Sequence, residues 1–205
     1  MKLYLASGNP HKAVEFQVLA DAVAPRVEIR SAAELGGMPP VVEDAGSFIG
    51  NAGKKLRTLK AVLPEGGWAL ADDSGLCVEE LGGEPGVDSA YYAGPQADAT
   101  ANLAKLVATM RGVPEPRRRA EFVCVLALGG PGVDEIRFEG RCVGRLADAP
   151  RGTGGFGYDP LFIPDGFDVT LAQMSAAQKA TLSHRGRAWA RCAAWLAARS
   201  QTVLD

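Results

Sequence analysis

The chain has 205 residues, of which 47% are hydrophobic and 22% charged, and its formal net charge is −2. These values are ordinary for a soluble globular protein, and the length favours one sizeable core, so we expect a single domain over residues 1–205. The only basic run is Arg117–Arg119, which argues against long nucleic acid as a partner. The apolar N-terminal stretch is too short for a signal peptide or a membrane span, so we expect a cytoplasmic protein with no membrane partner.

The cysteines are far apart in the sequence, without a C-x-x-C pair or a nearby pair of histidines: Cys77, Cys124, Cys142 and Cys192. Three of them fall inside apolar patterns, which is typical of buried free thiols in a reducing compartment. The spacing argues against zinc.

The first predicted elements are a buried strand over residues 2–6, the loop SGNPHK and an amphipathic helix. Asn9 should cap the helix, and Pro10 suits its first position. We expect its core face to consist of Val14, Val18, Leu19 and Val23. The loop aims backbone N–H groups and the positive end of the helix dipole outward, as a phosphate site requires, and Lys12 could reach the same anion. Most short loops of this kind are only connections, so both interpretations stay open.

A second helix is predicted after VVEDAGSF, with Ser47 as its N-cap. Its apolar stripe should consist of Phe48, Ala52, Leu56, Leu59 and Leu63. Glu43 and Asp44 precede this helix, where acids ordinarily compensate the helix dipole. The functional alternative makes Glu43 a metal ligand and Lys55 a phosphate contact.

The segment WALADDSGLCVEEL predicts a strand with a kink or turn at Ser74-Gly75. Asp72 and Asp73 would then hold two like charges close together at the mouth of a core, which is unfavourable unless a cation or a set of donors lies there. A solvated turn is the plainer interpretation of this acidic pair. A metal site is the functional one.

The rest of the chain predicts a helix capped by Asp98, a hairpin from AEFVCVLAL and EIRFEGRCVGRL, and a short strand at LFIP. The tail from 171 to 200 predicts helix, broken at SHRG, with a buried stripe of Trp189, Cys192, Ala193 and Leu196. Alternating strands and helices with one long hairpin indicate an α/β protein with a mixed sheet.

Two further segments carry polar or aromatic groups that suit a nucleotide base. The loop GTGGFGYDP frees the backbone to approach a ligand and could expose Phe156 for stacking, although a ring tucked into the core is an equal alternative. Lys179 and the pair His184-Arg185 offer donors to carbonyl oxygens. Together these segments predict a site for a nucleoside triphosphate with Mg²⁺. They offer hydrogen-bond donors for an anion, carboxylates for the metal ion, an aromatic ring for stacking and donors for the keto group of a base.

The ordered motifs SGNPHK, EDAGSFIGNA, ADDSGL, LGGEPGVDSA, GTGGFGYDPLF and LSHRG resemble the inosine triphosphate pyrophosphatase family from about residue 3 to residue 190. The resemblance implies a Mg²⁺-dependent hydrolase that converts dITP, ITP and XTP to the monophosphate and pyrophosphate, removing non-standard purines from the nucleotide pool. It also implies an elongated α/β homodimer, with two lobes around a nucleotide cleft.

Matched motif by motif, the resemblance also implies roles for individual side chains. Asp73 would be the base for water, with Asp72 in support, and the metal would be held by Glu43 and Asp73. The phosphate contacts would be Ser7, Gly8, Asn9, Lys12, Lys55 and Ser74. The base pocket would be lined by Phe156, Gly157, Tyr158, Asp159, Lys179, His184 and Arg185.

Four positions depart from the family's pattern. Ala45 stands in place of a glycine, Gly50 in place of a glutamate, Tyr91 in place of an arginine, and Gln178 in place of an acid. Without the glutamate the second helix has no capping box with Ser47, and each interior glycine costs about 1 kcal/mol relative to alanine. None of these changes removes an implied catalytic group.

Two rival functions stay open. A Maf-like nucleotide pyrophosphatase would have similar architecture and a different base preference, which the SHRG and GGFGYDP motifs argue against. A non-catalytic nucleotide sensor would bind through the same pocket, but it would have no need of the acids Glu43, Asp72 and Asp73.

Overall fold

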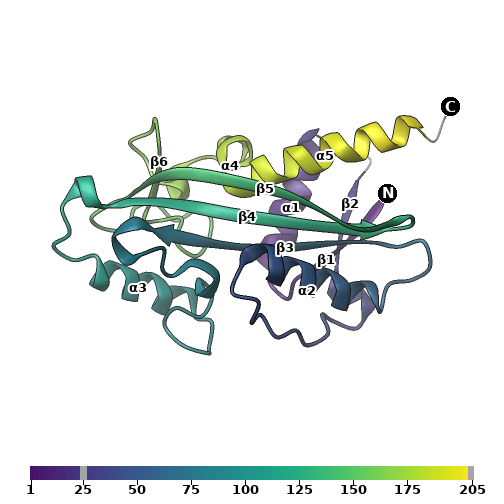
Figure 1. Cartoon of the computed structure of the whole chain (residues 1–205). Coiled ribbons are helices and arrows are strands. Elements are labelled where there is room, and N and C mark those ends of the chain that lie inside the picture. Colours follow the sequence, from purple (N-terminus) through teal and green to yellow (C-terminus); the bar gives the residue numbers. More distant parts are fainter. Residues whose placement is uncertain (24–26, 203–205) are drawn as a thin grey trace. The chain divides into compact units, whose positions relative to one another are not determined.

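The computed structural model describes residues 1–23 and 27–202. The strands are β1 (Lys2–Ala6), β2 (Glu28–Ser31), β3 (Trp68–Val78), β4 (Arg119–Gly130), β5 (Val133–Leu146) and β6 (Phe162–Pro164). The α-helices are α1 (Pro10–Val23), α2 (Phe48–Lys60), α3 (Ala99–Thr109), α4 (Ala176–Leu182) and α5 (His184–Thr202). The strand order is β2-β1-β3-β4-β5-β6, with β1 parallel to β2 and β3 and β6 antiparallel to β5 (Figure 1). The predicted α/β fold with a mixed sheet is therefore confirmed.

The chain divides into two compact units. In its described parts, unit 1 comprises Met1–Asp73, Cys124–Gly140 and His184–Asp205, and unit 2 comprises Ser74–Val123 and Arg141–Ser183. The strands β3, β4 and β5 each continue from one unit into the other. A single domain over residues 1–205 stays a prediction.

In unit 1, α2 covers one face of the sheet through its predicted stripe. Ala52, Leu56 and Leu59 are buried, and Phe48 and Leu63 pack against them. The sheet side of this cluster consists mainly of small residues, namely Ala6, Ala69, Ala71, Val125 and Ala127. Small side chains at alternate positions allow a helix to approach the strands closely, which brings polar groups at the edge of α2 within reach of β3.

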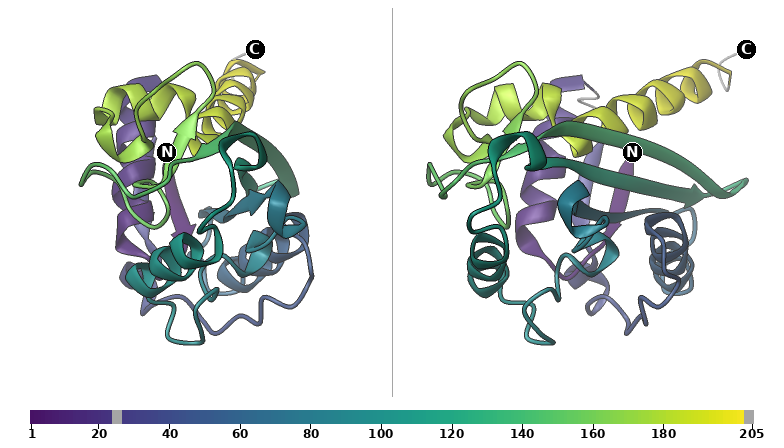
Figure 2. Two further views of the ribbon diagram at one scale, coloured as in Figure 1. Left: turned by 90° about the vertical axis from the view of Figure 1, so that its left-hand side faces the viewer. Right: turned by 60° about the vertical axis from the view of Figure 1, so that its left-hand side comes forward.

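The opposite face of unit 1 is covered by α1 and α5, which lie side by side (Figures 1 and 2). The Trp189 indole N–H donates to the Leu19 carbonyl at 3.0 Å, and its ring meets Phe16 edge-on with 6.1 Å between centroids. The predicted core face of α1 is wrong in part, since Val14 is 67% and Val18 41% exposed. Phe16, Leu19 and Ala20 are the buried residues, also at helical spacing. The side chain of Val23 lies outside the described residues.

The strand β3 runs without a break from Trp68 to Val78, so the predicted turn at Ser74-Gly75 is wrong. Leu76 and Val78 are fully buried, and the Leu76 N–H donates to the Ser89 hydroxyl at 2.9 Å. The burial of Leu76 and Val78 and this hydrogen bond keep the chain extended, although Ser and Gly ordinarily favour turns. The two acids therefore lie in the middle of a strand.

Unit 2 has its own core around α3, β6 and the neighbouring parts of the long strands. Arg118 is buried, and its guanidinium donates to four backbone carbonyls, those of Met110, Val113, Leu146 and Ala147. These bonds tie the end of α3 to the chain that leads into the glycine-rich loop. Arg118 thus has a structural role that the basic run in the sequence did not indicate.

The caps predicted for α2 and α3 are confirmed. The Ser47 hydroxyl accepts from the Gly50 N–H at 3.2 Å, and the Asp98 carboxylate accepts from Thr100 and Ala101. A Cβ added at Gly50 would lie 2.5 Å from the Cβ of Ala45. The two departures from the family's pattern are therefore coupled, because the methyl group of Ala45 takes up the space that a larger residue at position 50 requires.

No described helix combines the length and the apolar character that crossing a membrane requires. The buried thiols predicted from the sequence are confirmed for Cys124, Cys142 and Cys192, and Cys77 is partly exposed. All four are free.

Candidate active site

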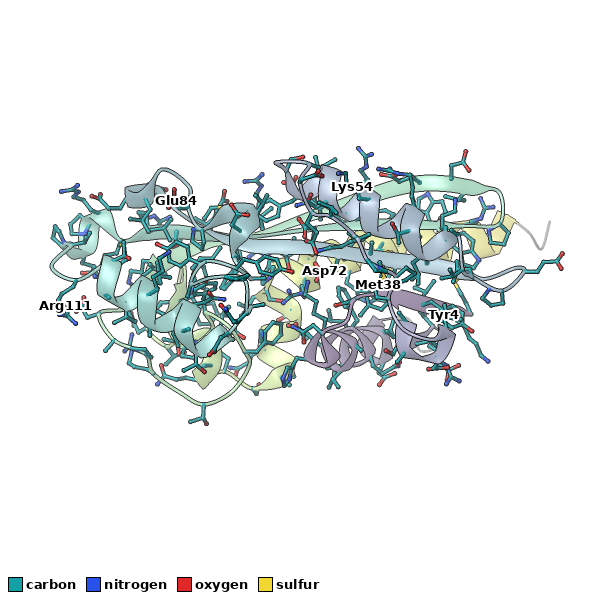
Figure 3. The ribbon with its side chains drawn as sticks, turned by 90° about the horizontal axis from the view of Figure 1, so that it is seen from below. Tyr4, Met38, Lys54, Asp72, Glu84 and Arg111 are labelled. Carbon is teal, nitrogen blue, oxygen red and sulfur yellow. The ribbon has the colours of Figure 1, made fainter. Side chains whose placement is uncertain are left out.

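Asp72 and Asp73 are adjacent in β3 and therefore point to opposite faces of the sheet. Asp73 faces α2, where Lys55 Nζ lies 2.7 Å from its Oδ1. Asp72, labelled on β3 in Figure 3, faces α1 and α5 and pairs with Lys12 and Arg185. The expectation that cations lie beside these acids is confirmed, with each carboxylate having its own.

Asp72 is the centre of a buried polar network. It is 0% exposed, and its Oδ2 lies 2.7 Å from Lys12 Nζ and 3.2 Å from Arg185 Nε. Its Oδ1 accepts from the Cys124 thiol at 3.3 Å. Burial alone would raise the pKa of Asp72, but the charges of Lys12 and Arg185 hold it far below its ordinary value. Asp72 is therefore ionised at neutral pH and orients two cations rather than facing a ligand itself.

Asp73 has a different electrostatic environment. Burial raises the pKa of this carboxyl to about 6; Lys55 opposes the shift, and Asp72 and Glu43 add to it. Its Oδ2 is buried and makes no hydrogen bond to any described residue. A buried carboxylate oxygen without a donor is unfavourable by itself, which is typical of a group that binds a ligand or handles a proton.

Glu43 reaches the same lysine from the loop before α2. Its Oε2 lies 2.6 Å from Lys55 Nζ, so one ammonium group bridges Glu43 and Asp73. The loop is held by Asn51, whose buried Oδ1 accepts from the Ala45 N–H at 3.1 Å. We did not predict this role for Asn51, although a polar residue beside Ala52 of the apolar stripe could have indicated a buried hydrogen bond.

The carboxylates fit the metal that the resemblance implies. No three or more His, Cys, Asp or Glu side chains form a metal-binding group within the described part of the chain. Mg²⁺, however, is usually held by one or two carboxylates together with substrate phosphates rather than by a complete protein cage. Glu43 and Asp73 are joined through Lys55, and one carboxylate oxygen of Asp73 lacks a donor among the described residues, so the two acids fit a site of this kind.

The loop before α1 is organised by its own side chains. The Ser7 hydroxyl accepts from the Asn9 N–H at 3.1 Å, and Asn9 Oδ1 accepts from the His11 N–H at 2.9 Å, which confirms Asn9 as the helix cap. A Cβ at Gly8 would meet no atom of the described residues within 4 Å. The ammonium group of Lys12 pairs with Asp72. To contact a phosphate as predicted, it would have to bind Asp72 and the phosphate together or move away from Asp72.

In unit 2 the glycine-rich loop brings three predicted residues together. Asp159 Oδ2 accepts from the Phe156 N–H at 2.8 Å and from Lys179 Nζ at 2.9 Å. Lys179 Nζ also lies 5.2 Å from the centroid of the Phe156 ring. Gly155 has φ +70°, and a Cβ there would lie 2.1 Å from Asp159 Oδ2, so this turn requires glycine.

The remaining predicted site residues of unit 2 differ in burial. Phe156 is half-buried, so its ring is not fully enclosed in the core, and its stacking role stays a prediction. Tyr158 is buried, and its hydroxyl donates to the Ser89 carbonyl at 2.8 Å. Gly157 follows the aromatic ring with φ +63°. Ser74, in β3, is half-buried.

His184 and Arg185 form the first turn of α5 in unit 1, and both are buried. Arg185 Nη1 lies 3.1 Å from Glu15 Oε2, so this guanidinium is held by Glu15 and Asp72 together. Glu15 was missed, although its spacing from Lys12 places both on one side of α1. A pocket that combines His184 and Arg185 with Phe156, Asp159 and Lys179 stays a prediction.

Comparison with known proteins agrees with the motifs. A sequence model of the Ham1 family matches residues 3–195. A dITP/XTP pyrophosphatase of Opitutus terrae is 56% identical over 200 residues, which cover 95% of this chain and 98% of that protein. A protein of the same name from Corynebacterium glutamicum is 44% identical over 193 residues, covering 92% of this chain and 93% of that one.

Solved structures lead to the same family. The Ham1 protein of Staphylococcus aureus has a TM-score of 0.82 at 36% identity, covering 97% of this chain and 100% of that one. The nucleoside-triphosphatase, or dITP/XTP pyrophosphatase, of Mycobacterium abscessus has a TM-score of 0.70 at 41% identity, covering 94% and 98%. These matches confirm the resemblance drawn from the motifs: the chain belongs to the Ham1 family.

Proposed function

We propose that this chain is a Mg²⁺-dependent pyrophosphohydrolase that converts dITP, ITP and XTP to the monophosphate and pyrophosphate. The observation that supports it most is the bridging of Glu43 and Asp73 by Lys55, beside the buried network around Asp72. Relatives that this chain matches over nearly their whole length are named dITP/XTP pyrophosphatase. We further propose that the enzyme acts in the cytoplasm as a homodimer, as the motif resemblance implies.

Asp73 is the proposed base. With a pKa near 6 it is mostly ionised at neutral pH and strong enough to accept a proton from water that attacks the α-phosphorus. A Mg²⁺ ion held by Glu43 and Asp73 would supply charge relief on phosphate oxygens and a lower pKa for water. Lys12, Lys55 and the N-terminus of α1 stabilise the negative charge of the departing pyrophosphate, mainly by electrostatics and positioning.

Selectivity comes from the edge of the base. Hypoxanthine and xanthine have a 6-oxo acceptor for donors from His184 and Arg185, whereas the 6-amino group of adenine leaves those buried donors unpaired. A mismatch of this kind can lower kcat/KM by about 10⁴-fold. Glu15 and Asp72 fix the direction of Arg185 in advance, which reduces the ordering required when the base binds.

A substrate panel tests the proposed function. ITP, dITP, XTP, ATP, GTP, dUTP and dTTP are compared with and without Mg²⁺, and pyrophosphate is measured separately from orthophosphate. We expect Mg²⁺-dependent release of pyrophosphate from the first three substrates. Preference for dUTP or dTTP would indicate the Maf-like alternative, and binding without multiple turnovers would indicate a sensor.

Phe156→Ala should raise KM for ITP and reduce the preference for ITP over ATP. Loss of a stacked base costs about 1–3 kcal/mol, so we expect kcat/KM to fall by about 5- to 150-fold. Phe167→Ala is the matched control, because Phe167 is an exposed phenylalanine in the same unit. Unchanged KM and base preference in Phe156→Ala would exclude a stacking role.

A further inference from the structure

Lys55 occupies the position between the two carboxylates that the proposed function assigns to a divalent ion. Its Nζ lies 2.6 Å from Glu43 Oε2 and 2.7 Å from Asp73 Oδ1. The Lys55 side chain is 12% and the Asp73 side chain 6% exposed, so this contact is shielded from water, whereas the Glu43 side chain is 30% exposed. An ammonium group in this place already neutralises part of the charge that a metal ion would neutralise.

The neighbouring lysine shows that this arrangement is not a general property of α2. Lys54 pairs with Asp44, but these side chains are 37% and 63% exposed. Exposed pairs of this kind contribute little, because water and salt screen them. Lys55 is instead largely buried beside Asp73, which has a buried oxygen without a donor among the described residues, and it also pairs with the partly exposed Glu43.

We propose that the Lys55 ammonium is a built-in competitor of the metal ion, and that substrate phosphates release this competition. The inference rests on the proposed function, since it concerns the site in which the nucleotide and the metal meet. Without nucleotide, Lys55 holds Glu43 and Asp73. With nucleotide, the phosphate oxygens become the partner of the ammonium, and the carboxylates are left to the divalent ion.

Lys55 and a metal ion compete through electrostatic repulsion. A divalent ion that used Glu43 and Asp73 would lie close to the ammonium of Lys55, and two cations in a shielded site repel strongly. Lys55 can move away only if another anion replaces the carboxylates, because an unpaired buried ammonium is unfavourable. The triphosphate supplies that anion. Metal and nucleotide therefore bind with positive coupling, and each strengthens the other by the same factor.

The coupling gives Lys55 a role beyond contacting phosphate. A lysine that only contacts phosphate would not influence how tightly the protein binds a metal ion in the absence of nucleotide. A competitor would weaken that binding. Metal affinity without nucleotide therefore separates the two roles.

The test measures Mn²⁺ binding to the full chain without nucleotide, by electron paramagnetic resonance of the free ion. Lys55→Met removes the charge and keeps an unbranched apolar side chain. We expect Mn²⁺ to bind about 10-fold or more tightly to this variant than to the unaltered protein, in line with the size of effects from groups next to metal ligands. Lys54→Met, the matched control, should bind Mn²⁺ as the unaltered protein does. Equal or weaker binding to Lys55→Met would overturn the proposal.

A second variant guards against a folding defect. Lys55→Arg keeps the positive charge and should keep Mn²⁺ binding weak. Lys55→Met should unfold at a lower temperature than the unaltered protein without metal, and Mn²⁺ should raise its Tm by a larger increment. An increment equal to or smaller than that of the unaltered protein would contradict the competition. Because these measurements need no turnover, they are independent of the substrate panel, whose failure would remove the proposed function instead.

Discussion

Asp73→Asn should lower kcat for ITP by about 10³-fold or more, while nucleotide binding stays measurable. The amide keeps the size of the side chain but cannot accept the proton of water, and it is a poor partner for a divalent cation. Single-turnover assays with ITP, together with calorimetric binding of the nucleotide, separate the two effects. Asp44→Asn is the matched control, because this exposed acid pairs with the surface residue Lys54. Full activity of Asp73→Asn would remove both assigned roles of this residue.

The same variant should be more stable than the unaltered protein above about pH 6. The pKa of Asp73 is raised in the folded state, so its contribution to stability is present below the ordinary aspartate pKa and is lost as the pH rises through about 6. Above that value an ionised, buried Asp73 opposes folding by about 1–3 kcal/mol, and the neutral amide avoids this. Urea unfolding without metal at pH 8 and pH 4 should show the gain at pH 8 only. An equal gain in the free energy of unfolding at pH 4 would contradict the raised pKa of Asp73.

Asp72→Asn should destabilise the protein by about 3 kcal/mol or more at neutral pH and also reduce activity. The change leaves Lys12 and Arg185 without the negative charge that lies 2.7 Å and 3.2 Å away in a fully buried site. Removing one partner of a buried ion pair is far more harmful than removing an exposed one. Activity should fall because both cations lose their fixed directions.

The control and the pH dependence make this prediction specific. Asp165→Asn removes a bidentate but exposed pair with Arg119 and should change the free energy of unfolding by about 1 kcal/mol or less. The pKa of Asp72 is strongly lowered, so its stabilisation is present above the ordinary aspartate pKa and declines as the pH falls below about 4. The difference between Asp72→Asn and the unaltered protein should therefore shrink between about pH 4 and pH 2. If Asp72→Asn and the unaltered protein differed little in free energy of unfolding at pH 7, the stabilising role of the Asp72 ion pairs would be contradicted.

Local signals predicted much of the fold. Ser47 and Asp98 cap helices as their side-chain chemistry favours, and the stripes of α2 and α5 follow helical spacing closely enough to identify their buried faces. The helix α1 shows the limit of this argument. Its apolar residues fit two faces, and the buried one packs against residues far away in the sequence, such as Trp189, which contacts Phe16 and Leu19.

The site was predictable as a set of residues but not as an arrangement. Ser74-Gly75 favours a turn locally, so the continuous strand that separates Asp72 from Asp73 depends on packing of Leu76 and Val78 that no local pattern reveals. The partners of each acid depend on which helix covers which face. Glu15, Asn51 and Cys124 act through other side chains, and residues of this kind carry no motif of their own.

Hydrolysis of ITP in H₂¹⁸O with Mg²⁺, followed by mass spectrometry of both products, shows which phosphorus the water attacks. Water directed by Asp73 at the α-phosphorus puts the heavy oxygen into inosine monophosphate and leaves the pyrophosphate unlabelled. Label in pyrophosphate, or orthophosphate as the released product, would show attack at a different phosphorus and contradict the account.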